Sequence, residues 1–156
     1  MLEKRRRITG LAALSLTAVG AVAGMEGAAY PTAKEPRPAV TGGGWLTDSL
    51  GARLHFALSA HEQDSGDFGH LNVRLEGNEG AFWGDVTSVQ IASDRAEIEG
   101  VVRKATGAYA ACEGESFNAT AQDGGDGREA DGLEGGCAGG PRFASPVEQG
   151  EVQVKP

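Results

Sequence analysis

Apolar and polar residues alternate along much of the chain after residue 44. Apolar residues recur at every second position in segments at 53–60, 71–76, 96–103, 116–121 and 151–154. Successive side chains of a β-strand point to opposite faces of the sheet. Each of these segments therefore predicts a strand with one apolar face.

One segment breaks this alternation. Val89 and Ile91 share one parity and Val86 lies on the other, which predicts a β-bulge near Ser88. The 25 glycines favour turns and bulges, because glycine within a helix costs about 1 kcal/mol relative to alanine. No segment beyond residue 30 has the period of an amphipathic helix. The pattern predicts an all-β fold, a single antiparallel sandwich or barrel of about seven or eight short strands.

The first 29 residues have the layout of a secretory signal peptide. A basic cluster at 4–7 precedes an apolar run at 8–23, which is too short and too rich in Gly, Ala and Ser for a spanning helix. Small residues permit cleavage after Ala23 or Ala29, and the polar Glu26 favours the second site. We therefore expect a signal peptide at 1–29, a proline-rich linker at 30–40 and one secreted β-domain at 41–156.

Charge narrows the choice of partners. Loss of residues 1–29 removes four basic and two acidic residues, so the formal net charge falls from −8 to −10. A chain this acidic repels nucleic-acid phosphates and anionic headgroups. The 127 residues that remain suffice for one core but not for two. We expect a monomer outside the cell that binds an extracellular ligand or protein, with no nucleic-acid partner and no membrane span.

Cys112 and Cys137 are the two cysteines of the chain. An even number of cysteines in an oxidising compartment predicts one disulfide. Closing this loop stabilises the fold by roughly 3 kcal/mol in the chain-entropy description. Two cysteines with no histidine beside them do not make a zinc site.

The order and spacing of eight short segments carry a resemblance to a known family. They are TGGGW (41–45), LHF (54–56), GHLNV (69–73), DVTSV (85–89), RAEIEG (95–100), FNATAQDG (117–124), DGL (131–133) and GEVQV (150–154). In this respect the chain resembles the post-choice-of-anchor domains, secreted bacterial β-domains found beside choice-of-anchor modules. The family has no assigned activity, so the resemblance implies a fold and a compartment. The cysteine pair and the charged insertion at 128–130 depart from the family pattern.

The adjacent aromatic residues Phe82 and Trp83 are candidate ligand-binding residues. Neighbouring side chains on a strand point to opposite faces, so one of the two rings is expected to face outward. An exposed ring beside Asp85 is suited to stacking on a sugar. The alternative is burial of this ring under a neighbouring loop.

Two groups of residues have the chemistry of metal ligands. Asp123, Asp126 and Asp131 lie in a glycine-rich loop, and oxygen-rich flexible loops suit Ca²⁺. His61 and His70 bracket the loop 62–69, so a closed hairpin would bring them to face each other. With Asp64 and Asp67 at the tip of this loop, they would form a set for Zn²⁺ or Cu²⁺. The alternative for both groups is a solvated polar loop, and we expect no required cofactor.

A secreted hydrolase is a less favoured alternative. Residues 47–50 and 67–70 are similar to two motifs of GDSL hydrolases, but a nucleophilic serine needs a strand-to-helix elbow, oxyanion donors and a base. No helix is predicted after Ser49. We therefore expect no catalytic site and a structural or binding role, with a carbohydrate- or small-ligand-binding barrel as the alternative.

N-terminal sequencing of the exported protein tests the signal peptide. We expect the chain to start at Tyr30, or at Gly24 if the first site is used. If the protein is found bound to the membrane with Met1 still at its N-terminus, the prediction of secretion is contradicted.

Overall fold

The computed structural model describes residues 37–48, 50–125 and 130–156, and within these nine strands form one antiparallel sheet. The order across the sheet is β8-β7-β6-β5-β4-β3-β2-β1-β9. The elements are β1 (Ala39–Thr47), β2 (Arg53–His61), β3 (Phe68–Leu75), the 3-10 helix η1 (Glu76–Asn78), β4 (Gly80–Ala92), β5 (Arg95–Gly107), the 3-10 helix η2 (Ala110–Cys112), β6 (Ser116–Gln122), β7 (Gly132–Cys137), β8 (Arg142–Pro146) and β9 (Gln149–Lys155).

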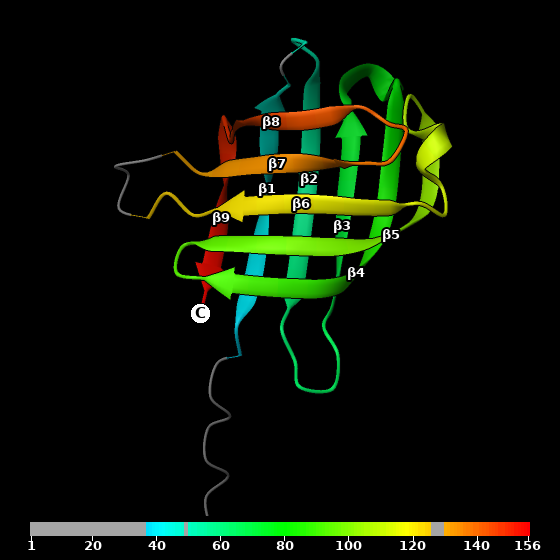
Figure 1. The fold of residues 1–156 in the computed structure, drawn as a ribbon. Helices are drawn as coiled ribbons and strands as arrows, with labels where there is room; N and C mark the ends of the chain where they lie inside the picture. Colours follow the sequence, from blue (N-terminus) through cyan, green and yellow to red (C-terminus); the bar gives the residue numbers. More distant parts are fainter. Residues whose placement is uncertain (1–36, 49, 126–129) are drawn as a thin grey trace, which may run out of the picture. The chain divides into compact units, whose positions relative to one another are not determined.

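The sheet curls over itself into a half-barrel with two layers. In Figure 1, β6, β7 and β8 run crosswise in front of β1, β2, β3 and β9. The long strands β4 and β5 belong to both layers, since they pair with each other over their whole length and with β3 on one side and β6 on the other. The first half of β4 and the second half of β5 lie in the back layer with β3 (Figure 1). The all-β prediction is confirmed.

β4 and β5 turn the corner between the layers at two irregularities. The register shifts between Trp83 and Gly84 and between Val86 and Ser88, so the bulge predicted near Ser88 is confirmed. Gly84 and Gly100 are buried here, and a Cβ on either glycine would overlap the ring of Phe117. The absence of side chains at these positions lets the ring of β6 pack directly on the bent backbone.

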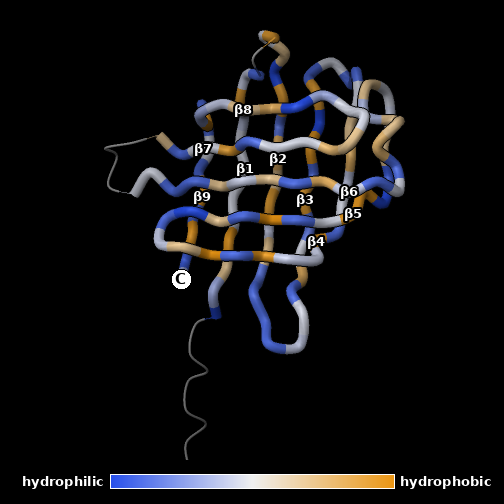
Figure 2. Tube along the Cα trace, in the orientation of Figure 1, coloured by the Kyte–Doolittle hydropathy of each residue, from blue (hydrophilic) through white to orange (hydrophobic). Residues whose placement is uncertain are grey.

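The space between the layers is filled by the apolar residues of each alternating strand. Figure 2 shows hydrophobic and hydrophilic positions alternating along β2, β3 and β5. The largest fully buried side chains are Tyr109, Phe56, Phe82, Phe143, Leu46, Leu54, Leu71, Ile98, Leu133, Val40, Val73 and Val102. The interior is therefore a packed core.

The domain has more strands than the seven or eight predicted from the sequence. β7 contains three glycines and β8 has five residues, so neither shows a clear alternation of side chains. β1 begins at Ala39, two residues inside the predicted linker, and Val40 is fully buried. The predicted signal peptide at 1–29 and the linker up to residue 36 lie outside the described residues. No helix in the described part is long and apolar enough to cross a membrane.

Two carboxylates tie the edge strand β9 to the opposite layer. They belong to Asp123 and Asp131, at the ends of the connection between β6 and β7. Asp131 accepts a hydrogen bond from the backbone N–H of Val152 at 2.7 Å, and Asp123 accepts one from Val154 at 3.0 Å. The second oxygen of each carboxylate accepts a backbone N–H of its own loop at 2.8 Å. These bonds satisfy backbone groups of β9 that no further strand pairs. We call this arrangement the aspartate seam.

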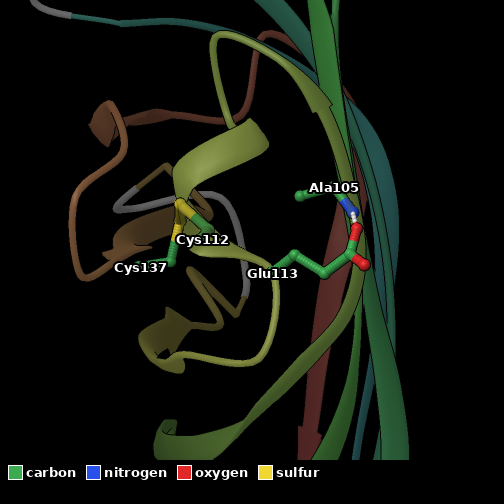
Figure 3. Close-up of a disulfide and its surroundings, with 4 residues drawn as sticks. All are labelled: Ala105, Cys112, Glu113 and Cys137. Atoms are coloured by element: carbon green, nitrogen blue, oxygen red, sulfur yellow. Dashed lines mark hydrogen bonds between the residues drawn. A yellow bond between two sulfur atoms is a disulfide. The ribbon is translucent and has the colours of Figure 1, made fainter.

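The disulfide holds the connection between β5 and β6. Cys112 in η2 is bonded to Cys137 at the end of β7, with an S–S distance of 2.04 Å and a Cα–Cα distance of 5.7 Å (Figure 3). Glu113 extends to the other side and accepts a hydrogen bond from the backbone N–H of Ala105 at 3.2 Å. The predicted disulfide is confirmed, and it anchors the segment that carries the buried Tyr109.

The aspartate seam can be tested by substitution. Asp131→Ala leaves the N–H groups of Gly124 and Val152 without their acceptor, so we expect a loss of about 2–4 kcal/mol in the free energy of unfolding. Asp131→Asn keeps one acceptor oxygen and should lose less. Urea denaturation measures both, with the exposed Asp64→Ala as the control, expected within about 0.5 kcal/mol of the parent chain. Equal stability of Asp131→Ala and Asp64→Ala would show that the seam does not stabilise the fold.

Candidate functional site

Both tryptophans of the chain lie on the outward side of the back layer. Trp45 is half-buried on β1, and Trp83 on β4 is 41% exposed. His55, Asn72 and Arg74, which are all exposed, lie between them on β2 and β3. We call the surface formed by these five residues the tryptophan face.

The strand register places these residues in two neighbouring rows. One row runs Trp45–His55–Arg74–Ala81 across β1 to β4, and the next runs Gly43–Ala57–Asn72–Trp83–Lys104 across β1 to β5. The tryptophans therefore occupy diagonal corners, about 14 Å apart across the strands. The small residues of the rows leave space between them.

A surface hollow of about 440 Å³ lies on this face. It is lined by Trp45, His55, Ala57, Asn72 and Arg74. An indole, an imidazole, an amide and a guanidinium group thus surround one open depression. These groups offer an apolar surface together with hydrogen-bond donors and acceptors.

Trp45 is held in place by its neighbours. Its ring meets His55 edge to face with centroids 5.1 Å apart, and the guanidinium carbon of Arg53 lies 4.8 Å from the ring centroid. Arg53 is itself held by Glu76 at 3.7 Å and Glu148 at 3.8 Å. Cation–π and edge contacts of this kind fix an aromatic ring before any ligand arrives.

Phe82 and Trp83 are neighbours on β4, and their side chains therefore point to opposite faces of the sheet. Trp83 faces outward, as predicted for one of the two rings. Phe82 is 1% exposed and packs against Tyr109 and Phe117, with centroids at 5.2 Å and 5.9 Å. The proposal of Phe82 as a ligand-binding residue is therefore corrected: it is a core residue.

His61 and His70 do not face each other. His61 is opposite Phe68, on which its ring stacks at 4.8 Å, and His70 is opposite Ser59. The hairpin closes about a shorter loop than predicted because β3 begins at Phe68. The two histidines lie on the same face as diagonal neighbours, two register positions apart, so they are near each other but do not form a directly opposed pair.

Of the two aspartates of the β2–β3 loop that were candidate ligands, Asp67 holds backbone groups. Asp67 accepts hydrogen bonds from the N–H of Gln63 at 3.0 Å and of Val89 at 2.7 Å, which ties the β2–β3 loop to β4. Asp64 is exposed at the tip of this loop. Asp67 therefore has a loop-anchoring contact that its sequence position did not predict.

Two aspartates of the proposed calcium loop likewise accept hydrogen bonds from the backbone of the protein. Asp123 and Asp131 form the aspartate seam, and Asp126 lies outside the described residues. In the part of the chain that the structure describes, no group of three or more His, Cys, Asp or Glu residues is placed to hold a metal ion. Ser49 of the hydrolase-like motif also lies outside the described residues.

Two buried side chains, those of Tyr109 and Asp48, are ionisable. Tyr109 is fully buried and Asp48 is 7% exposed. Burial, reinforced by the charge of Asp48, raises the pKa of Tyr109 from 10.0 to about 12. Asp48 accepts hydrogen bonds from the N–H groups of Leu50 and Ala52 at 2.9 Å and 2.8 Å, so it shapes the β1–β2 turn.

Sequence reasoning singled out Trp83 and missed the other four residues of the tryptophan face. Trp45 follows three glycines near the end of β1, and His55, Asn72 and Arg74 are ordinary polar positions of alternating strands. The signal that unites them is the pairing register of β1 to β4. That register cannot be derived from one strand at a time.

No protein family, no curated protein and no solved structure matches this chain. The resemblance to post-choice-of-anchor domains stays a prediction. Any function must therefore be argued from the tryptophan face itself.

The buried phenol of Tyr109 predicts how the stability of the fold depends on pH. The pKa of Tyr109 is about 12 in the folded protein and 10.0 as its ordinary value, so the folded state keeps a proton that the unfolded state loses. Its contribution to stability is complete below pH 10 and falls between pH 10 and 12, by at most about 1.4 kcal/mol per pH unit. The ultraviolet difference titration between the parent chain and Tyr109→Phe measures this pKa. Ionisation of Tyr109 near pH 10 in the folded protein would contradict it.

Proposed function

We propose that the protein is a secreted, non-catalytic module that binds carbohydrate on the tryptophan face. The observation that carries this proposal is the exposed indole of Trp83 diagonal to Trp45, with a hollow lined by Trp45, His55, Ala57, Asn72 and Arg74 on the same face. With 41% of its surface exposed, Trp83 offers an aromatic ring face on which a ligand can stack.

Carbohydrate fits the chemistry of this surface. The C–H face of a sugar ring packs on an indole, and its hydroxyl groups both donate and accept hydrogen bonds. Asn72, His55 and Arg74 lie where such hydroxyls would be, around the hollow. Because the site lies open on the face of a sheet, a polysaccharide chain can continue past both ends of the site.

A ligand inside the barrel is less well supported. The inward positions are occupied by Phe56, Phe82, Phe143 and other large side chains, and the packing leaves the outer face as the better candidate. This favours the carbohydrate-binding alternative on the outside of the fold.

Intrinsic fluorescence tests the proposal directly, since both tryptophans of the chain belong to the face. The mature chain is titrated with a panel of soluble plant, fungal and bacterial polysaccharides while tryptophan emission is recorded. At least one polysaccharide should change the emission saturably. Trp83→Ala, with retention measured by affinity electrophoresis, should weaken binding at least about fivefold through loss of the stacking contact.

Phe68→Ala is the matched control. Phe68 is a 47% exposed aromatic residue on the same side of the sheet, four residues from Asn72 along β3 and thus about 14 Å away. It should bind like the parent chain. No bound polysaccharide in the panel, or equal binding by Trp83→Ala and the parent chain, would refute the proposal.

A further inference from the structure

The tryptophan face is cationic in a protein that is otherwise acidic. The two rows across β1 to β5 contain two cationic residues, Arg74 and Lys104, and no carboxylate. Within the described residues, no carboxylate lies at ion-pair distance from Arg74 or Lys104. With a formal net charge of −8 for the whole chain, such a surface does not follow from composition.

Three of the acidic groups around this surface have other contacts. Asp85 is paired with Arg103 at 2.7 Å, and Glu76 with Arg53 at 3.7 Å. Glu113, beside the edge of β5, accepts the backbone N–H of Ala105. Asp85 and Glu76 are thus paired with arginines, and Glu113 is hydrogen-bonded to the backbone.

One further carboxylate extends the second row at its far end. Glu151 on β9 is opposite Gly43, and it accepts a hydrogen bond from Gln153 at 3.0 Å. Gly43 and Ala57 separate it from Asn72. The positive charge is therefore concentrated toward β3 and β5, around Trp83.

The other layer has a mixed outer surface, on which Arg95 and Arg142 lie among glutamates and Arg95 pairs with Glu134 at 3.7 Å. Glu97 and Glu99 on β5 and Glu134 on β7 are exposed on its outer side. The corner in β4 and β5 separates this surface from Arg74 and Lys104. Among the described residues, Arg74 and Lys104 thus lie beside an exposed aromatic ring and away from these glutamates, while the net negative charge of the chain repels large polyanions such as nucleic acid.

We infer that the ligand of the tryptophan face is an acidic polysaccharide, one that carries carboxylate or sulfate groups. This inference rests on the proposed function and adds the charge of the ligand to it. Arg74 offers a planar guanidinium that can bind a carboxylate or sulfate with two hydrogen bonds. Lys104 is the cross-strand neighbour of Trp83, so a sugar stacked on that indole would place an acidic substituent beside an ammonium group.

The test uses pairs of polymers that differ in charge. Polygalacturonate is compared with its methyl ester, carboxymethylcellulose with hydroxyethylcellulose, and dextran sulfate with dextran, by tryptophan fluorescence of the mature chain. In at least one pair the charged member should bind at least about tenfold more tightly, and added salt should weaken its binding.

Two double variants locate the effect. Arg74→Gln/Lys104→Gln should lose the preference for the charged polymer. Arg95→Gln/Arg142→Gln removes the same charge from the other layer and should keep the preference. Circular dichroism establishes that each variant is folded, and the salt dependence of the parent chain needs no variant.

The outcomes separate the two proposals. If neutral polysaccharides bind as tightly as their charged partners, the inference on charge fails and the proposed function stands. If no polysaccharide binds, the proposed function fails. Equal losses in both double variants, or duplex DNA bound as tightly as the best acidic polysaccharide, would reduce the effect to general polyanion binding and overturn the inference.

Discussion

The bend of β4 and β5 is the constraint on which the other features depend. A single sheet can enclose a core only if some of its strands pass from one layer to the other. Here the register shifts at Trp83 and Val86 change the direction of the strands, and Gly84 and Gly100 let Phe117 pack against the bend. The same bend sets apart the outer surfaces of the two layers. Trp83 and Lys104, just before and after the corner, are thereby directed to the back layer with Trp45 and Arg74.

A curled sheet still has two edges, and the aspartate seam resolves this difficulty at β9. Backbone N–H groups at Val152 and Val154 have no strand to pair with on that side, and carboxylates take the place of a ladder. A carboxylate accepts backbone N–H groups strongly and needs only one residue to do so. This explains why an acidic, glycine-rich connection resembled a calcium site in the sequence. The oxygens suited to a cation serve the backbone of the protein instead.

Sequence periodicity predicted the strands whose side chains alternate, and it found the bulge near Ser88. It could not find β7, because glycines have no side chain with which to alternate. The three glycines in the middle of β1 likewise hid the alternation of that strand, whose first residues were assigned to the linker. The disulfide followed from cysteine number and compartment alone. Of the residues of the candidate site, the sequence identified Trp83 alone. His55, Asn72 and Arg74 become a surface when β2 and β3 pair in one register, and a shift by one residue would have directed them to the core.

The position of the tryptophan face on paired strands bears on what it can bind. The register of a sheet fixes the backbone position of each residue and the face to which it points, and Trp45 is further held by His55 and by Arg53, which two carboxylates restrain. A surface of this kind loses little backbone entropy on binding, so stacking and ionic contacts need not offset the cost of ordering loops. It is also open along both strand and row directions, and it encloses no small molecule. Rigid, open and cationic, the face is better matched to a polymer that repeats one acidic sugar than to a single compact ligand.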